Sequence, residues 1–294
     1  MFYRRKILLS IVQVFENNLD KMHLLKLLFL LTKKQKVKIY DFIPYQYGCF
    51  SYSVYADINA LVQNSILREE NNTLSMTIST DYVGQLKQED RYYLQQIKTM
   101  FGTMSNDDLI KYTYINYPYW ATKSVIAKKV LTTIEYEKLK QYQPESDKTI
   151  LYTLGYEGIS LEEYLNRLIL NDIKVLIDVR SNPLSMKYGF SKSQLQRFCH
   201  NSGIEYLHFP EVGITSDKRS ELYTQSDYEN LFIDYCNNNL PKTVATQNRI
   251  FDILKQKERV ALTCFEANIN RCHRKYLADA IASMPQFTYE LKHI

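Results

Sequence analysis

The residues best suited to chemistry lie in two segments of the second half of this 294-residue chain. Residues 178–181 read Asp-Val-Arg-Ser and directly follow the apolar run 175–177. Residues 264–274 read Cys-Phe-Glu-Ala-Asn-Ile-Asn-Arg-Cys-His-Arg and follow a second apolar run. Carboxylates, imidazoles and thiols move protons or attack substrates, and arginines bind phosphate or carboxylate in a bidentate manner. We therefore predict that the two segments form one polar, anion-binding site.

Each of these side chains has a structural alternative to its functional role. We expect Glu266 or Asp178 to act as a general base, although either carboxylate could instead pair with a neighbouring arginine. Cys264 could be a nucleophile or a small buried residue that closes a strand, and His273 could be a base or a helix cap. The predicted catalytic residues are Asp178, Cys264, Glu266 and His273, and the predicted substrate-binding residues are Tyr156, Arg180, Ser181, Arg271, Cys272 and Arg274.

Two other uses of the cysteines are disfavoured by spacing. A thiol at a strand end before an anion-binding loop is typical of tyrosine phosphatases and rhodaneses. In the phosphatase pattern the arginine is one residue closer than here, where six residues separate Cys264 from Arg271 and none is glycine. Cys272 and His273 are adjacent and are expected to point to different faces, with no second ligand pair in the sequence. We therefore predict no metal site, and the sequence identifies no cofactor.

The segments that must position this site alternate between strands and helices. Such alternation is typical of a Rossmann-like α/β fold with a mostly parallel sheet, in which ligands bind at the carboxyl ends of the strands. We place this domain at residues 147–294, after the polar stretch 141–148 with its single proline. The predicted strands are 149–154, 175–179, 205–209 and 260–264, and the predicted helices are 161–170, 191–201, 228–237 and 273–283.

The first half has a different pattern and is predicted to be mainly helical. Apolar residues at helical spacing predict helices near 8–15, 24–31 and 57–62. Residues 66–70 and 73–78 then predict two strands joined in a hairpin by the turn residues between them. Three helices followed by a hairpin are typical of a winged helix. We therefore predict a winged-helix-like domain over residues 1–146.

Composition and charge indicate the cellular compartment and the kinds of partner to expect. The five cysteines are scattered along the chain, so we expect reduced thiols and no disulfide framework. The apolar stretch 24–31 is too short to cross a bilayer, and the start of the chain is not typical of a secretory signal. These features predict a cytoplasmic protein with no membrane partner. The net charge of +5 is mild, but basic residues are concentrated before residue 39. They could form a nucleic-acid contact or a solvated surface.

Six separated motifs in the second half occur in one order and resemble the family known as domain of unknown function 488. The resemblance covers about residues 149–294 and implies a Rossmann-like domain with a polar, catalytic pocket at residues 178–181 and 264–274. Residues 212–214, Val-Gly-Ile, stand where the family has Leu-Gly-Gly, so this loop departs from the family pattern. The motifs are Thr-Leu-Gly-Tyr-Glu-Gly from 153, Leu-Ile-Asp-Val-Arg-Ser-Asn-Pro from 176, Gly-Phe-Ser-Lys from 189, Gly-Ile-Glu-Tyr from 203, Pro-Glu-Val-Gly from 210, and Cys-x-Glu with Arg-Cys-His-Arg from 264.

The first half resembles the SocA-like, or Panacea, domain associated with antitoxins and proteolysis adaptors. The resemblance implies recognition of a partner and not catalysis. Cys49 stands where the family has a proline, which keeps the local turn but removes its stiffness. The matching stretches are Lys-Leu-Leu-Phe-Leu from 26, Tyr-Gly-Cys-Phe-Ser from 47, Asp-Ile-Asn-Ala-Leu from 57 and Tyr-Pro-Tyr-Trp from 117.

Two classes of function follow from these patterns. The first is an enzyme or sensor directed at a nucleotide or nucleic acid, with an anion-binding pocket at the carboxyl edge of the sheet, in phage defence or DNA modification. The alternative is a non-catalytic regulator of the antitoxin or adaptor type. In that case residues 1–146 would bind DNA, or would dock a protein partner through exposed aromatic residues such as Tyr45, Tyr47 and Trp120.

Overall fold

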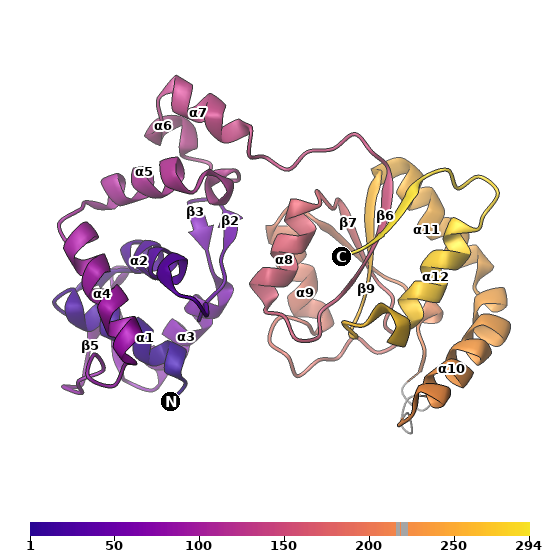
Figure 1. The fold of residues 1–294 in the computed structure, drawn as a ribbon, viewed down its shortest axis with the longest axis horizontal. Coiled ribbons are helices and arrows are strands. Elements are labelled where there is room, and N and C mark those ends of the chain that lie inside the picture. Colours follow the sequence, from indigo (N-terminus) through magenta and orange to yellow (C-terminus); the bar gives the residue numbers. More distant parts are fainter. Residues whose placement is uncertain (216–217, 219–222) are drawn as a thin grey trace. The chain divides into compact units, whose positions relative to one another are not determined.

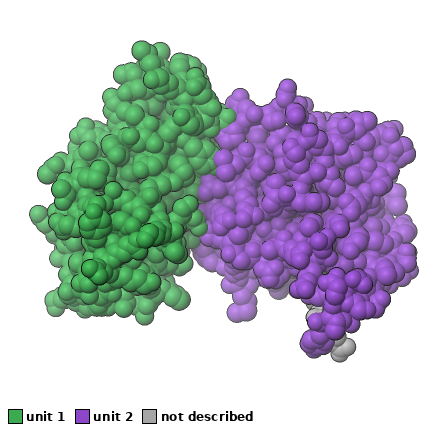
Figure 2. All heavy atoms as spheres, viewed as in Figure 1, with its two compact units in different colours: residues 1–143 green, residues 144–294 purple. Residues whose placement is uncertain are grey.

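The structure is a computed structural model that describes residues 1–215, 218 and 223–294. The chain divides into two compact units, Met1–Gln143 and Pro144–Ile294, shown in green and purple in Figure 2. The seam between them falls within the polar stretch 141–148. Each unit has a hydrophobic core of its own, and each is therefore described by itself.

The first unit opens with two helices that bury their apolar faces together. α1 (Tyr3–Val14) and α2 (Lys21–Lys34) include most of the residues that their spacing predicts to be helical. The chain breaks between them at Glu16 and Asn17, whose φ angles are 65° and 55°. α2 begins after Asp20, whose carboxylate accepts hydrogen bonds from two amides of the first turn. This capping satisfies amides that otherwise have no partner in the helix.

A hairpin follows the third helix, as the sequence pattern predicts. β4 (Leu67–Glu70) and β5 (Thr73–Met76) are antiparallel. Asn71 and Asn72 join them with φ angles of 49° and 65°, the left-handed conformation that a two-residue hairpin turn requires. β1 (Leu19–Asp20) pairs with the other side of β5, which gives the strand order β1-β5-β4. The finer classification of this unit as a winged helix stays a prediction.

The rest of the first unit packs around α2. Phe29 in α2 contacts the rings of Phe42, Tyr117 and Trp120 at centroid distances of 5.3, 5.1 and 5.2 Å. Trp120 is therefore half-buried in this packing and is not the exposed anchor that the sequence suggested. The remaining elements are β2 (Ile43–Tyr45), β3 (Gly48–Phe50), α3 (Tyr52–Gln63), α4 (Gln88–Phe101), α5 (Asn106–Asn116), the 3-10 helix η1 (Pro118–Ala121), α6 (Ala127–Val130) and α7 (Thr133–Lys140).

The second unit is built on a five-stranded sheet in which every pair of strands is parallel (Figure 1). The strand order is β10-β6-β9-β7-β8. Every residue of the three inner strands is buried, which explains why apolar residues predominate in these strands. The prediction of an α/β domain with a parallel sheet is confirmed. The strands are β6 (Ile150–Gly155), β7 (Val175–Asp178), β8 (Glu205–His208), β9 (Arg259–Cys264) and β10 (Glu290–His293).

Helices cover both faces of this sheet. α8 and α9 lie on one face, and α11 and α12 lie on the other (Figure 1). Apolar side chains of α11 and α12 join those of the strands in one buried cluster. The helices are α8 (Leu161–Leu170), α9 (Lys192–Asn201), α10 (Gln225–Asp234), α11 (Val244–Lys257) and α12 (His273–Ala282), with the shorter elements η2 (Pro210–Val212), η4 (Tyr235–Asn239), η5 (Leu240–Lys242) and η6 (Ile269–Arg271).

Two elements of this unit were not predicted from the sequence. β10 is an edge strand with mostly exposed side chains, so no apolar run marks it. α11 buries residues 247, 250, 251 and 254, a helical spacing that the sequence contains and that the prediction overlooked. Within the ranges that the structure describes, no helix combines the length and the apolar character needed to cross a membrane.

Candidate functional site

Three polar segments meet at the carboxyl edge of the parallel sheet. Gly155 at the end of β6 is in register with Cys264 at the end of β9, and Asp178 at the end of β7 is in register with Thr263. The segments that follow these strands are therefore neighbours, as expected for ligand sites in parallel sheets. A cavity of about 260 Å³ lies among them. Its lining residues are Tyr156, Arg180, Ser181, Asn182, Leu184, Ser185, Ile214, Cys264 and Phe265.

Asp178 and Arg180 form a buried ion pair beside this cavity. Arg180 donates from Nε to Asp178 Oδ1 at 2.8 Å and from Nη2 to Asp178 Oδ2 at 2.5 Å. The hydroxyl of Tyr206 donates to the same carboxylate at 2.6 Å. Asp178 is fully buried and Arg180 is only 6% exposed. The sequence allowed Asp178 either to act as a general base or to pair with an arginine, and the structure shows the pairing. Glu266 is therefore the better candidate for the general base.

The remaining donors of Arg180 also point into the protein. Its Nη1 donates to the hydroxyl of Tyr156 at 2.6 Å and to the carbonyl oxygen of Phe190 at 2.9 Å. The Tyr156 ring stacks on the Phe190 ring at a centroid distance of 4.2 Å. Burial alone would lower the pKa of Arg180, but the hydrogen bonds and charge of Asp178 outweigh it and raise that pKa. Arg180 is therefore a permanent cation that positions the cavity wall.

Cys264, Glu266 and His273 form a second cluster at this edge. The Cys264 thiol donates to Glu266 Oε2 at 3.1 Å and lies 3.8 Å from His273 Nδ1. His273 Nε2 lies 3.0 Å from the carbonyl oxygen of Val179, which can only accept a hydrogen bond. Nε2 therefore carries a proton, and Nδ1 is the ring nitrogen that faces the thiol. Cys264 and His273 are buried, whereas Glu266 is half-buried.

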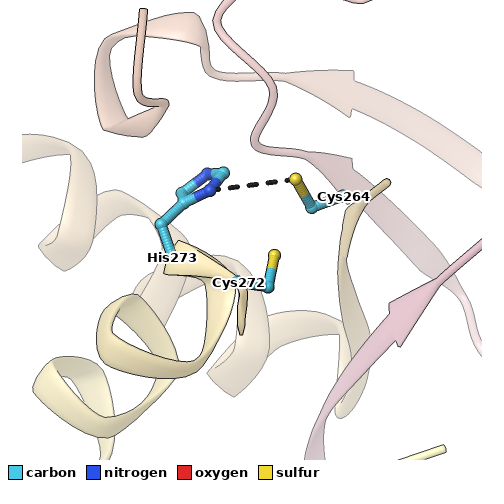
Figure 3. Close-up of side chains that lie close together, drawn as sticks. All are labelled: Cys264, Cys272 and His273. Carbon is cyan, nitrogen blue, oxygen red and sulfur yellow. Dashed lines mark hydrogen bonds between the residues drawn. The ribbon is translucent and has the colours of Figure 1, made fainter. Parts of the chain in front are cut away.

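Cys272 completes this cluster, contrary to the expectation that it and His273 point to different faces. The donor atoms of Cys264, Cys272 and His273 all lie within 4.8 Å of one another. Figure 3 shows both side chains at the start of α12 directed toward Cys264 at the end of β9. The reason is the change of backbone at this point. Cys272 has extended backbone angles (φ −136°, ψ 134°), and His273 is the first helical residue, so the usual alternation of a strand does not apply.

The other two predicted arginines do not line the cavity. Arg274 is 2% exposed and donates from Nη1 to the carbonyl oxygen of Glu266 at 2.5 Å and from Nη2 to that of Ala267 at 3.3 Å. It therefore fixes the loop that carries Glu266. Arg271 is exposed, with its guanidinium carbon 5.6 Å from the centre of the Tyr228 ring. The prediction that both arginines contact a bound anion has no support in this geometry.

The prediction from the sequence missed several residues of the cavity. Asn182, Leu184 and Ser185 follow the predicted Ser181 directly, so extending the strand-end argument along the loop would have found them. Ile214 has no such signal, because only the packing of its loop brings it to the cavity. The hydroxyl of Ser181 donates to the carbonyl oxygen of Ile214 at 2.7 Å, which fastens the two loops together.

The fold and the site together define an α/β domain with a polar cavity at the carboxyl edge of a parallel sheet. Residues 160–281 of the chain match the family model described as domain of unknown function DUF488. The match supports the predicted assignment of the second unit to that family, and it includes the segments 178–181 and 264–274. Neither the curated proteins nor the solved structures include a match to the chain. The resemblance of the first unit to the SocA-like domain stays a prediction.

Proposed function

We propose that the second unit is an enzyme that acts on a nucleotide or nucleic acid, with Glu266 as its general base. The observation that carries the proposal is the cluster of Cys264, Glu266 and His273, of which Cys264 lies in the wall of a polar cavity. Ionisable groups held together beside a cavity at strand ends are typical of catalytic sites. Glu266 is the member of this cluster that remains partly accessible to solvent.

The aromatic residues around the cavity favour a nucleobase as the part of the substrate that is recognised. Phe265 is 42% exposed and lines the cavity beside Tyr156, with the two rings edge to face at a centroid distance of 5.3 Å. Exposed aromatic rings stack on bases of any sequence. Asn182 and Ser185 add polar groups that can bind the edge of a base. Arg271 and Arg274 do not line the cavity, and Arg180 lines it with donors that Asp178, Tyr156 and Phe190 already engage. We therefore expect recognition through the base more than through phosphate.

Phe265→Ala is expected to weaken binding of a fluorescently labelled single-stranded oligonucleotide by about 1–3 kcal/mol for each stacked base. Anisotropy titration of the full chain at fixed salt measures this loss. The matched control is Phe2→Ala, because Phe2 is also exposed, at 66%, but lies in the first unit. Equal affinities of the wild type and Phe265→Ala would remove the stacking proposal.

Glu266→Gln is expected to keep oligonucleotide binding but to lose at least about 10²-fold in turnover, because an amide cannot accept a proton as a general base does. Mass spectrometry of nucleotide and oligonucleotide substrates after incubation detects the product. Glu229→Gln, at an exposed position of α10, is the control for the charge change. Unchanged turnover in Glu266→Gln would contradict the assigned role.

The first unit is better suited to dock a protein than to bind DNA, and this is our second proposal on function. Several of its basic residues are already engaged. Arg4 and Arg5 both pair with Asp57, at 2.5 and 2.7 Å. Lys21 pairs with Glu69 at 2.5 Å, and the Lys33 ammonium lies 3.4 Å from the centre of the Trp120 ring. The ion pairs of Arg4, Arg5 and Lys21 reduce the charge that would otherwise face a phosphate backbone, and the contact of Lys33 with Trp120 holds its ammonium group against an aromatic ring.

A cavity of about 240 Å³ in this unit supports the docking of an acidic group. Lys26 lies in its wall, is 1% exposed, and donates to the carbonyl oxygen of Tyr47 at 2.6 Å. It also donates to Cys49 Sγ at 3.5 Å, and none of the ion pairs found among the described residues includes Lys26. Around it are the aromatic side chains of Tyr45, Phe50 and Tyr55. A partner's carboxylate flanked by apolar groups would supply the missing counter-charge.

Lys26→Met is expected to abolish binding of an acidic aromatic peptide by the full chain while leaving the fold intact. A buried charge without a carboxylate partner contributes little to stability, so its replacement by an apolar side chain of similar length should be tolerated. Calorimetry with the free and the amidated peptide measures the contribution of the carboxylate. Lys34→Met, an equivalent change on the same helix, is the control. Strongly salt-dependent binding of duplex DNA by the full chain, with no peptide binding, would instead favour the DNA-binding alternative.

A further inference from the structure

We propose that Cys264, Cys272 and His273 form a binding site for a zinc ion at the carboxyl edge of the sheet. The three side chains are 1%, 0% and 0% exposed, and their donor atoms lie within 4.8 Å of one another (Figure 3). Among the common metal ions of proteins, zinc is the one that a set of two thiolates and one imidazole favours. The proposal depends on this ligand geometry alone and holds whether or not the unit acts on nucleotides.

The distance between two of the three donors, Cys264 Sγ and His273 Nδ1, is close to that of a tetrahedral site. Zinc binds sulfur at about 2.3 Å and imidazole nitrogen at about 2.0–2.1 Å, so tetrahedral angles place the two donors roughly 3.5 Å apart. Cys264 Sγ and His273 Nδ1 are 3.8 Å apart. Binding therefore requires only a small inward movement of these two atoms. A disulfide between Cys264 and Cys272 would need the two sulfur atoms at about 2.05 Å, and none of the five cysteines, all within the described residues, forms a disulfide.

The surroundings of His273 match those of a histidine that binds metal. Such a histidine almost always donates its second ring N–H to a carbonyl or carboxylate, which fixes the tautomer and the ring orientation. His273 Nε2 lies 3.0 Å from the carbonyl oxygen of Val179, which leaves the Nδ1 lone pair for the ion. The ring of Tyr235 packs edge to face against the imidazole at a centroid distance of 5.6 Å. The nitrogen is thus positioned before any ion binds.

Three protein ligands leave the fourth position of the ion open. Cys264 is both a proposed ligand and part of the cavity wall, so an ion bound to it would lie next to the cavity. Structural zinc sites are usually closed by four protein ligands, whereas catalytic sites keep one position for water or substrate. The carboxylate of Glu266, 3.1 Å from Cys264 Sγ, is close enough to accept a proton from a molecule bound there. We therefore assign the site to the catalytic class.

The direct test is the zinc content of the full chain. Protein purified under reducing conditions from zinc-supplemented cells is expected to hold about one zinc ion per chain by elemental mass spectrometry. Cys264→Ser, Cys272→Ser and His273→Asn should each lower this content at least tenfold. Cys236→Ser is the matched control, because it makes the same chemical change outside the three-residue cluster and should retain the ion. Absence of zinc from the wild type, or an unchanged content in the three variants, overturns the proposal.

A second measurement avoids dependence on the folding of the variants. Bound zinc should slow alkylation of Cys264 and Cys272 in the wild type at least tenfold relative to chelator-treated protein, but leave the alkylation of Cys236 unchanged. Substitution by cobalt should give thiolate-to-metal charge-transfer absorption. A Cys264–Cys272 disulfide with no bound metal in reductant-free preparations would overturn the proposal. Zinc binding without turnover of any nucleotide would remove the proposed function and leave the metal site standing.

Discussion

Asp178→Asn is expected to lower the free energy of unfolding by about 3–5 kcal/mol, because it leaves the guanidinium of Arg180 buried without a counter-charge. The pair lies between the sheet and the cavity, with Asp178 fully buried and Arg180 6% exposed. Urea denaturation followed by circular dichroism measures the change. The single tryptophan, Trp120, is in the first unit, so its fluorescence reports a part of the chain that the substitution does not touch.

A double variant separates the charge from the loss of a hydrogen bond. Asp178→Asn combined with Arg180→Met removes the unpaired charge, and it is expected to recover a large part of the stability lost in the single variant. Glu205→Gln breaks the exposed ion pair with Lys257 and should leave the free energy of unfolding nearly unchanged. If Asp178→Asn costs no more than this surface control, the buried pair does not stabilise the unit.

Gly155→Ala is expected to have the second large effect, because the loop that carries Glu266 passes directly over this residue. A Cβ atom at Gly155 would lie 1.9 Å from the carbonyl oxygen of Glu266 and 2.7 Å from its carbonyl carbon. The loop cannot move away easily, since Phe265 O accepts from two amides after β6 and Arg274 holds Glu266 O. We expect a loss of about 1–3 kcal/mol or more in stability, and displacement of Glu266 from Cys264.

Gly158→Ala is the matched control for this variant. Gly158 has a φ of +78° but nothing within 4 Å of an added Cβ atom. Its replacement should lower the free energy of unfolding by only about 1–2 kcal/mol, the cost of placing a side chain on a left-handed backbone, and should leave the site geometry unchanged. The two variants are compared by chemical denaturation and by turnover or zinc content. Full retention of both site properties in Gly155→Ala would show that the close approach of the loop does not position Glu266.

The architecture of the second unit could be predicted because its strands are marked in the sequence. The runs before Gly155, Asp178 and Cys264 are mostly apolar and fully buried, as expected for strands covered on both faces. Parallel strands bring their carboxyl ends to one edge, so the convergence of these three points followed from the order of the elements. β10 could not be predicted, because an edge strand with exposed side chains has no such mark.

The roles of individual side chains were much less predictable. Arg180, Arg271 and Arg274 have the same side chain, yet the first pairs with Asp178, the second is exposed and the third holds a loop. The sequence contains their chemistry but not the direction in which each guanidinium points. The direction depends on which acceptors packing brings within about 3 Å of it. The same limit explains why Cys272 and His273 were expected to diverge.

By itself, the sequence determined the parallel α/β class of the second unit and the edge of the sheet at which its polar residues gather. Both depend on apolar periodicity and chain order, which are local properties. Only the tertiary structure decided that Asp178 and Arg180 neutralise each other and that Cys264, Cys272 and His273 converge. Those outcomes depend on contacts between residues that α12, β7 and β9 bring together, and the free energy of burying a charge or a thiol is defined only there.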